Sequence, residues 1–360
     1  MFEKPQEADT RPTIPGKIYN LRKYFILGLL LGLFIITVIW MVSEFKINSD
    51  DLSIVTPLGL SFMQKVQNPL YEKILSVKTV DNYPGSKYFP FNLTPIYEDD
   101  LHLSSDIFAV MDRDSRELLY SKNLTKAVPI ASISKIMTAI TALDSAPLDM
   151  TIYISVFAAN TGEAHMGLSA GERLSLQDLL YGSLLPSGND AAEAIAEGVG
   201  KYQKKIPLSE TDGGGARKLF IDEMNRKGQS LGMMDTYFFS PTGLDEKDLS
   251  KTTFSTPLDL LALTNYALTN STFAETVNTK NKIIPYKNGE HKAYFLYNIL
   301  SLDRSFAGIK GVKPGISDFA KETLVSYIER DGRRIIVVIL NSRRTKDDVL
   351  AIYKRIFSKS

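Results

Sequence analysis

Cysteine is absent from the 360 residues of this chain, and histidine is scarce. Without cysteine the chain has no disulfide, no thiolate ligand for zinc and no thiol nucleophile. The three histidines leave few candidates for a catalytic triad or a multi-histidine metal site: His102, His165 and His291. We therefore expect no metal and no cofactor, and a catalytic base of a residue type other than histidine.

An excess of charge of either sign is also absent. Lysine and arginine number 42 against 41 acidic residues, which gives a net charge of +1. This balance provides no electrostatic attraction for nucleic acid, so we expect no nucleic-acid partner. An apolar share of 44% suffices for a buried core in one large domain or two smaller ones.

Charged residues are missing from one long segment, Tyr24 to Val42. A helix of these nineteen residues would be about 28 Å long, close to the hydrocarbon thickness of a bilayer. A buried core helix is seldom apolar on every face, and a cleaved signal peptide has a shorter apolar region and a small-residue cleavage site, which Trp40 to Val42 do not form. We predict an uncleaved, single-pass transmembrane anchor over 24–42.

The charges that flank this segment predict its orientation. Cationic residues precede it and mostly acidic residues follow it: Lys17, Arg22 and Lys23 before, and Glu44, Lys46, Asp50 and Asp51 after. The positively charged flank of a transmembrane segment stays on the cytoplasmic side. Residues 1–23 are therefore predicted to form a cytoplasmic tail, and the anchor is predicted to lie in a bacterial cell membrane. Everything from residue 43 onward is then extracytoplasmic, together with its substrates and partners.

The sequence after the anchor divides into an irregular part and a regular part. Residues 43–103 combine polar runs with prolines and scattered aromatics, and we predict a stalk that partly packs on the following domain. In that domain, residues 104–360, two pairs of apolar segments joined by polar turns predict antiparallel hairpins: 106–112 with 117–123, and 323–329 with 333–341.

Helical periodicity fills the middle and the end of the domain. The predicted helices span 134–144, 175–185, 189–199, 216–231, 256–270 and 345–357. The glycine-rich segment 204–215 is predicted to be a mobile surface loop. It lacks the signature of a phosphate-binding loop, so we expect no phosphate site there. The fold class is therefore α+β, with an antiparallel sheet flanked by a helical region.

Ser132 and Lys135 stand at the start of one predicted helix. At this spacing both side chains project from the same side of the first turn, so the lysine amine can reach the serine hydroxyl. The amine can act as a base only where its surroundings disfavour the charged form, for which the helix dipole and a second cation, Lys313, are candidates. Alternatively, Ser132 caps the helix and Lys135 is solvated. The same spacing occurs in Ser43 and Lys46, where no catalytic setting is evident.

Two more short motifs follow in order, Ser187-Gly188-Asn189 and Lys313-Pro314-Gly315. Taken alone, the first fits a loop before a helix capped by Asn189 or Asp190, and the second fits a turn between strands. Together with Ser-x-x-Lys, however, they match the set S-x-x-K, S-D-N and K-T-G of penicillin-binding proteins and class A β-lactamases.

On these motifs the chain resembles the low-molecular-mass penicillin-binding proteins, the serine-type D-Ala-D-Ala carboxypeptidases. The resemblance covers roughly residues 104–357 and includes the blocks AVPIASISKIMTAI, HMGLSAGERLSLQDLLYGSLLPSGNDAAEAIAE, LGMMDTYFFSPTGLDEKDLSKTTFSTPLDLLALTNYAL and GIKGVKPG. It implies a penicillin-binding-protein/β-lactamase-like fold. A class A β-lactamase shares the motifs, but its usual Glu-x-x-Leu-Asn loop is not visible after Asn189.

The resemblance implies a hydrolase that removes the terminal D-alanine from peptidoglycan stem peptides. Ser132 would attack the peptide carbonyl, Lys135 would accept its proton, and Ser187 would relay a proton to the leaving D-alanine. Water would then hydrolyse the acyl-enzyme. Such an enzyme would act in cell-wall synthesis and cell shape, and β-lactam antibiotics would be its covalent inhibitors.

The resemblance also implies a set of substrate-binding residues. Asn189 would hold Lys135 and the substrate amide, and Lys313 would support the proton relay electrostatically. The backbone N–H groups of Ser132 and Ile316 would form the oxyanion hole, with Gly315 beside them.

Pro314 departs from the family pattern, because threonine usually stands at this position and its hydroxyl helps to bind the terminal carboxylate of the substrate. Proline offers neither a hydroxyl nor a backbone N–H, although an edge strand tolerates it. Ser317 is a candidate to replace the hydroxyl. The departure leaves two alternatives to the carboxypeptidase: a D,D-endopeptidase of cross-linked peptidoglycan, and a catalytically weak homologue that only binds penicillin or peptidoglycan.

Overall fold

The computed structural model describes residues 85–98, 101–207, 210, 214–300, 302 and 305–358. The chain divides into two compact units, Met1–Gln67 and Asn68–Ser360, and all described residues belong to the second unit. No helix among these residues combines the length and apolar character needed to cross a membrane. The predicted cytoplasmic tail, the predicted anchor and the stalk up to residue 84 lie outside the described residues, as do residues 208, 209 and 211–213 of the predicted loop 204–215.

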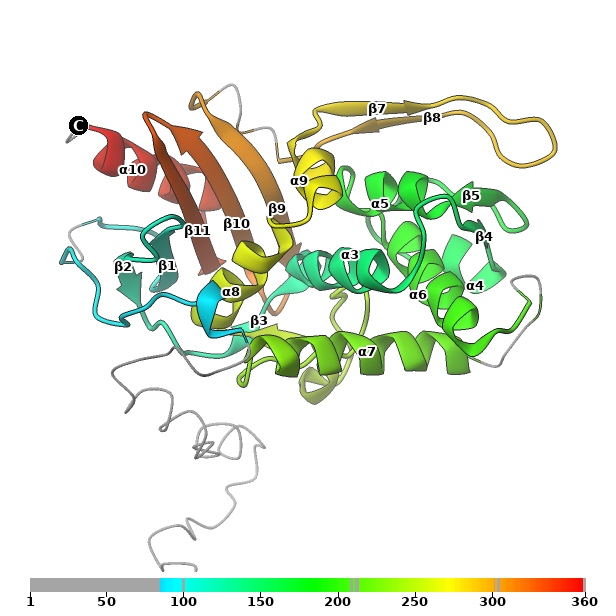
Figure 1. The fold of residues 1–360 in the computed structure, drawn as a ribbon, viewed down its shortest axis with the longest axis horizontal. Coiled ribbons are helices and arrows are strands. Elements are labelled where there is room, and N and C mark those ends of the chain that lie inside the picture. Colours follow the sequence, from blue (N-terminus) through cyan, green and yellow to red (C-terminus); the bar gives the residue numbers. More distant parts are fainter. Residues whose placement is uncertain are drawn as a thin grey trace, which may run out of the picture. The chain divides into compact units, whose positions relative to one another are not determined.

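The largest element is a five-stranded antiparallel sheet, built from both ends of the described chain (Figure 1). Its strands are β1 (Ile107–Asp112), β2 (Leu118–Lys122), β9 (Ile309–Ser317), β10 (Lys321–Arg330) and β11 (Arg333–Ser342). They lie in the order β2-β1-β11-β10-β9, so that β9 forms one edge. Both predicted hairpins are confirmed, because β1 pairs with β2 and β10 pairs with β11.

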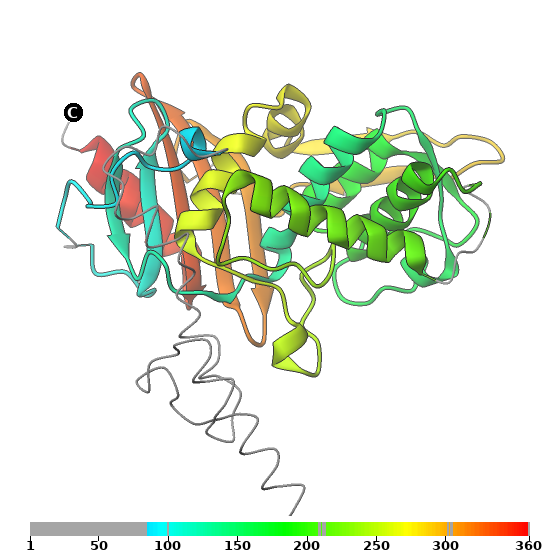
Figure 2. The same cartoon turned by 60° about the horizontal axis from the view of Figure 1, so that its bottom comes forward.

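Helices cover both faces of this sheet, which explains why β1 and β11 are apolar almost throughout. The C-terminal helix α10 (Thr345–Phe357) packs on β10 and β11, and α8 (Pro257–Ala267) packs on β1 and β11. Figures 1 and 2 show α10 on one side of the sheet and the other helices on the opposite side. Val337 accordingly belongs to the apolar cluster under α10, whereas its neighbour Val338 faces the main core.

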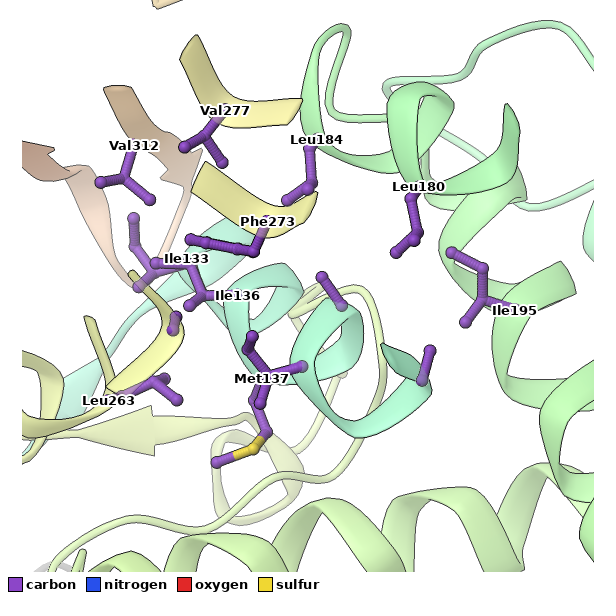
Figure 3. Packing of buried hydrophobic residues seen from close by; sticks show 14 of the residues in the cluster. Ile133, Ile136, Met137, Leu180, Leu184, Ile195, Leu263, Phe273, Val277 and Val312 are labelled. Atoms are coloured by element: carbon purple, nitrogen blue, oxygen red, sulfur yellow. The ribbon is translucent and has the colours of Figure 1, made fainter. Parts of the chain in front are cut away.

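A helical region stands beside the sheet (Figure 2). It consists of α3 (Ser134–Ser145), α4 (Val156–Ala159), α5 (Leu176–Leu184), α6 (Asn189–Lys204), α7 (Gly215–Leu231), α8 and α9 (Ser271–Asn278). Helix α3 is central, and its buried residues Ile136 and Met137 belong to the same cluster as side chains of α5, α6, α9 and β9 (Figure 3). This packing fixes the start of α3 beside the edge strand β9, which places the Ser-x-x-Lys motif between the sheet and the helices.

Several short elements were not predicted from the sequence. Two-stranded pairs join β3 (Val128–Pro129) to β6 (Phe254–Ser255), β4 (Thr151–Tyr153) to β5 (Arg173–Ser175), and β7 (Asn281–Ile284) to β8 (Tyr294–Tyr297). The 3-10 turns are η3 (Ser86–Tyr88), η4 (Ala131–Ile133) and η5 (Leu249–Lys251). The end of the predicted stalk contacts the sheet, because the N–H groups of Ile96 and Tyr97 donate to carbonyls of Leu118 and Leu119.

Candidate active site

Ser132 lies in the 3-10 turn η4, which runs directly into helix α3. The preceding residue, Ala131, has a left-handed φ of 48°, a conformation that costs a non-glycine residue about 1–3 kcal/mol. The Ser134 hydroxyl holds the Ala131 carbonyl at 3.0 Å, and a Cβ on Gly243 would lie 1.9 Å from the same oxygen. The turn is therefore clamped from two sides, and the Ser132 side chain is left half-exposed at its corner.

Lys135 is fully buried, and its amine contacts three oxygens. The Nζ atom lies 2.9 Å from Ser132 Oγ, 2.7 Å from Asn189 Oδ1 and 3.0 Å from the carbonyl oxygen of Thr242. Ser132 makes no side-chain cap of the helix. The alternative of a capping serine beside a solvated lysine is thus not what the structure contains.

Burial lowers the pKa of Lys135 to about 7, although the carboxylates of Glu193, Glu163 and Asp190 act in the opposite direction. Lys313 is also fully buried, and burial together with the positive charge of Lys135 holds its pKa well below the usual value. The sequence predicted that a second cation would lower the pKa of Lys135. In the structure burial is the main cause for Lys135, and for Lys313 the positive charge of Lys135 adds to the effect of burial.

The Ser187-Gly188-Asn189 motif stands at the start of helix α6. Asn189 does not cap this helix, because its Oδ1 accepts from Lys135 and its Nδ2 donates to the carbonyl of Gly162 at 2.9 Å. Ser187 is 4% exposed and has a left-handed φ of 66°. The motif therefore places a strained serine and a fixed amide on the helical side of Ser132, across from the sheet.

Asp190 was considered in the sequence only as a possible cap, but it anchors a loop. Its carboxylate accepts hydrogen bonds from the backbone N–H groups of Met166, Gly167 and Leu168, each at 2.9 Å, and from that of Ala191. A loop that runs from α4 to β5 is thereby attached to the start of α6, next to the Gly162 carbonyl that holds Asn189. The spacing of 22 to 24 residues between these partners gives no sequence signal.

The Lys313-Pro314-Gly315 motif lies in the edge strand β9 rather than in a turn. A Cβ on Gly315 would lie 3.0 Å from the backbone nitrogen of Ser132 and 2.6 Å from Thr323 Oγ1. The absence of a side chain at this position therefore lets β9 approach the nucleophile. Ile316 follows directly with a side chain that is 71% exposed, and it lines a groove of about 1500 Å³ together with Glu163.

Pro314 lies in the edge strand β9. Its missing N–H therefore costs the inner strands of the sheet no hydrogen bond. Its carbonyl accepts from Lys313 Nζ at 2.9 Å. Ser317 donates its hydroxyl proton to Asp245 Oδ1 at 2.9 Å, and Asp245 also accepts the N–H of Phe319. The proposed replacement of the missing threonine hydroxyl by Ser317 is therefore not supported, because its proton is already engaged.

The three motifs thus come together from three distant parts of the chain. Ser132, Lys135 and Asn189 are joined by direct hydrogen bonds, and Gly315 lies against the Ser132 backbone. The carbonyl of Thr242 completes the surroundings of the amine, and nothing in the spacing of the motifs indicated it. An accessible hydroxyl next to a buried amine with a pKa of about 7 is an arrangement suited to nucleophilic catalysis.

Comparison with known proteins agrees with this geometry. The sequence profile of peptidase family S11, D-alanyl-D-alanine carboxypeptidase, matches residues 95–344. The chain is 28% identical over 243 residues to the D-alanyl-D-alanine carboxypeptidase DacF of Bacillus subtilis, a match that covers 66% of this chain and 57% of that protein. It is 31% identical over 244 residues to the D-alanyl-D-alanine carboxypeptidase of Streptomyces sp. K15, covering 64% and 79%.

Relatives with other names match similarly. A D-alanyl-D-alanine endopeptidase of Pseudomonas aeruginosa is 29% identical over 67% of this chain and 72% of its own length. The crystal structure of the Streptomyces K15 DD-transpeptidase superposes with a TM-score of 0.64 at 27% identity, covering 74% of this chain and 100% of that one. The fold is therefore the penicillin-binding-protein/β-lactamase-like α+β fold, and the chain belongs to peptidase family S11, the D-alanyl-D-alanine carboxypeptidase family.

Proposed function

We propose that this protein is a serine-type D-Ala-D-Ala carboxypeptidase that removes the terminal D-alanine from peptidoglycan stem peptides. The observation that carries the proposal is the contact of 2.9 Å between Lys135 Nζ and Ser132 Oγ, made by an amine whose pKa burial lowers to about 7. An amine with this pKa has lost its proton in about half of the molecules at pH 7, so its neutral form is available to take the proton of the serine. Relatives named as carboxypeptidases support the choice of reaction.

The hydrogen-bond partners of Lys135 orient it for this step. A neutral amine has two hydrogens and one lone pair. The carbonyl oxygens of Asn189 and Thr242 have no proton to donate. Each of them therefore accepts one of the two hydrogens of the amine. The lone pair then faces Ser132 Oγ, which is the partner that can donate.

In the proposed reaction Ser132 Oγ attacks the carbonyl carbon of the penultimate D-alanine while its proton passes to Lys135. The oxyanion accepts hydrogen bonds from the backbone N–H groups of Ser132 and Ile316. These two groups can come close together because Gly315 has no side chain. Ser187 relays this proton from Lys135 to the amine of the leaving D-alanine as the C–N bond breaks, and Lys313 supports the relay electrostatically. Water then attacks the acyl-enzyme and releases the shortened peptide and the free serine.

The substrate end is the part of the proposal that Pro314 affects. A carboxypeptidase has to recognise a terminal carboxylate, and neither Pro314 nor the engaged hydroxyl of Ser317 offers it a proton. A D,D-endopeptidase cuts a cross-link and needs no such group. The relatives named D-alanyl-D-alanine endopeptidase in Pseudomonas aeruginosa and Escherichia coli favour this second candidate function.

The proposal places the enzyme outside the cytoplasm. The predicted anchor 24–42 would hold it on the cell membrane as a single-pass protein, where peptidoglycan is accessible. β-Lactam antibiotics would acylate Ser132 in place of the stem peptide. A reporter fused to the C-terminus should be active only outside the cytoplasm, and activity confined to the cytoplasm would contradict this placement.

Two substrates separate the candidate functions. The full chain, in detergent, is incubated with a stem pentapeptide and with a cross-linked muropeptide, and products are identified by mass spectrometry. Release of free D-alanine from the pentapeptide, absent in Ser132→Ala, supports the carboxypeptidase. Cleavage of the cross-link without D-alanine release would establish the endopeptidase instead, and no turnover of either substrate would leave the weak homologue.

A further inference from the structure

The hairpin formed by β7 and β8 presents an apolar outer face. Its paired residues alternate, so that Ile283 and Phe295 lie opposite each other on the outer face while Ile284 and Tyr294 pair on the inner face. The exposed fractions are 61% for Ile283 and 64% for Phe295, against 2% and 4% for the inner pair. Tyr297, two residues beyond Phe295 on the same face, and Ile299, just after the end of β8, are also at least half-exposed.

These four residues, Ile283, Phe295, Tyr297 and Ile299, form an apolar patch on a hairpin that hydrogen bonds hold in place at its tip and its base. At the tip, Arg173 donates to the carbonyls of Gly289 and Glu290. At the base, the N–H of Ile299 donates to the carbonyl of Leu185 at 3.1 Å. Figure 1 shows the hairpin along the edge of the described helical region, next to α5 and α9. These bonds fix the orientation of the hairpin backbone. The apolar side chains of the patch therefore stay exposed.

Positive charge accompanies this apolar patch. Residues 280–299 contain four lysines and one glutamate, although the whole chain is nearly neutral. Lys287, near the tip, has a side chain that is 63% exposed and that pairs with Glu290 at 2.9 Å. Aromatic and aliphatic side chains flanked by lysines are typical of surfaces that enter the interface of an anionic bilayer. A partner for this patch should therefore be both apolar and negatively charged.

We propose that the outer face of the β7–β8 hairpin docks on an anionic lipid surface and holds the catalytic domain against the membrane. The proposal uses the anchor predicted at 24–42. Only 42 residues, 43–84, separate that segment from Gly85, so the described domain stays within about 150 Å of the bilayer even if they are fully extended. At this effective concentration a weak apolar and electrostatic contact is sufficient. Docking adds a second attachment that orients the active site.

The absence of cysteine makes a site-specific test possible. The full chain is reconstituted in vesicles with Phe295→Cys carrying an environment-sensitive fluorophore, and quenching by brominated lipid is measured. The matched control carries the same fluorophore at Ser115→Cys, on the exposed turn between β1 and β2. Phosphatidylcholine vesicles are compared with vesicles rich in phosphatidylglycerol. Labelled penicillin checks, separately, that each variant keeps its active site.

Docking predicts a blue shift and at least twofold stronger quenching for the probe at position 295 in anionic vesicles, with little change at position 115. High salt and Lys287→Ala should reduce this quenching, because both weaken the attraction to anionic lipid. Equal quenching at the two positions, or none at 295, would overturn the proposal. So would a blue shift that requires added peptidoglycan fragments, which would identify the wall polymer as the partner. These fluorescence readouts do not depend on catalysis, so loss of acylation would count only against the proposed reaction.

Discussion

Replacement of Gly315 by alanine tests how closely strand β9 has to approach the nucleophile. The new Cβ would lie 2.6 Å from Thr323 Oγ1 and 3.0 Å from the Ser132 nitrogen, and both distances are shorter than a normal contact. Thr323 cannot simply move away, because its hydroxyl donates to the carbonyl of Ile130 at 3.1 Å. The strand has to shift instead, and a shift of about 1 Å in an active site costs roughly 100-fold in rate. We therefore expect acylation of Gly315→Ala by labelled penicillin to be slower by about two orders of magnitude.

Gly228→Ala is the matched control for this variant. Gly228 lies in the last turn of α7, where the nearest side-chain atoms to a new Cβ are 3.8 Å and 3.9 Å away. This substitution should raise the free energy of unfolding by about 0.5–1 kcal/mol and leave acylation unchanged. Adding Thr323→Ala to Gly315→Ala removes the closest contact and should restore part of the rate. A folded Gly315→Ala protein that is acylated as fast as the wild type would refute the reasoning.

Three other changes test separate parts of the account. The acylation rate should rise with pH through about 7, because the base is the neutral form of Lys135 and its proton is lost in that range; a rate that does not vary across neutral pH would exclude this base. Asp190→Asn should lower the free energy of unfolding in urea by about 2–4 kcal/mol, because three N–H groups lose a charged acceptor; an unchanged transition midpoint would show that the loop needs no anchor. Pro314→Thr should increase D-alanine release from a pentapeptide, and no increase would remove the missing hydroxyl as the limitation.

The sheet hairpins and the long helices could be predicted because their signals are local. The pair β10 and β11 is visible as two apolar runs around Asp331-Gly332, and α8 begins at Pro257 after a capping threonine. The hairpin β7–β8 was missed, because its alternation is short and its outer positions are as apolar as its inner ones. A pattern of hydrophobic and polar residues cannot reveal a strand whose exposed face is also apolar.

The residues of the candidate site also fall into two groups, those that could be predicted from the sequence and those that could not. The motif residues Ser132, Ser187 and Lys313 were identifiable because of the resemblance, which supplied what three short and separate patterns could not. Their surroundings were not identifiable, since the Thr242 carbonyl and the backbone N–H groups around Asp190 depend on contacts between distant segments. Burial, which lowers the pKa of Lys135, is likewise a property of the packed fold rather than of the sequence near the lysine.

Covalent labelling of Ser132 tests the central claim most directly. The full chain is incubated with labelled penicillin, and the adduct is counted by intact-mass analysis and located by peptide mapping. The account predicts a single adduct on Ser132 in the wild type, a greatly slowed reaction in Lys135→Arg because arginine stays protonated, and no adduct in Ser132→Ala. An unlabelled wild type, or an undiminished adduct in Ser132→Ala, would contradict it.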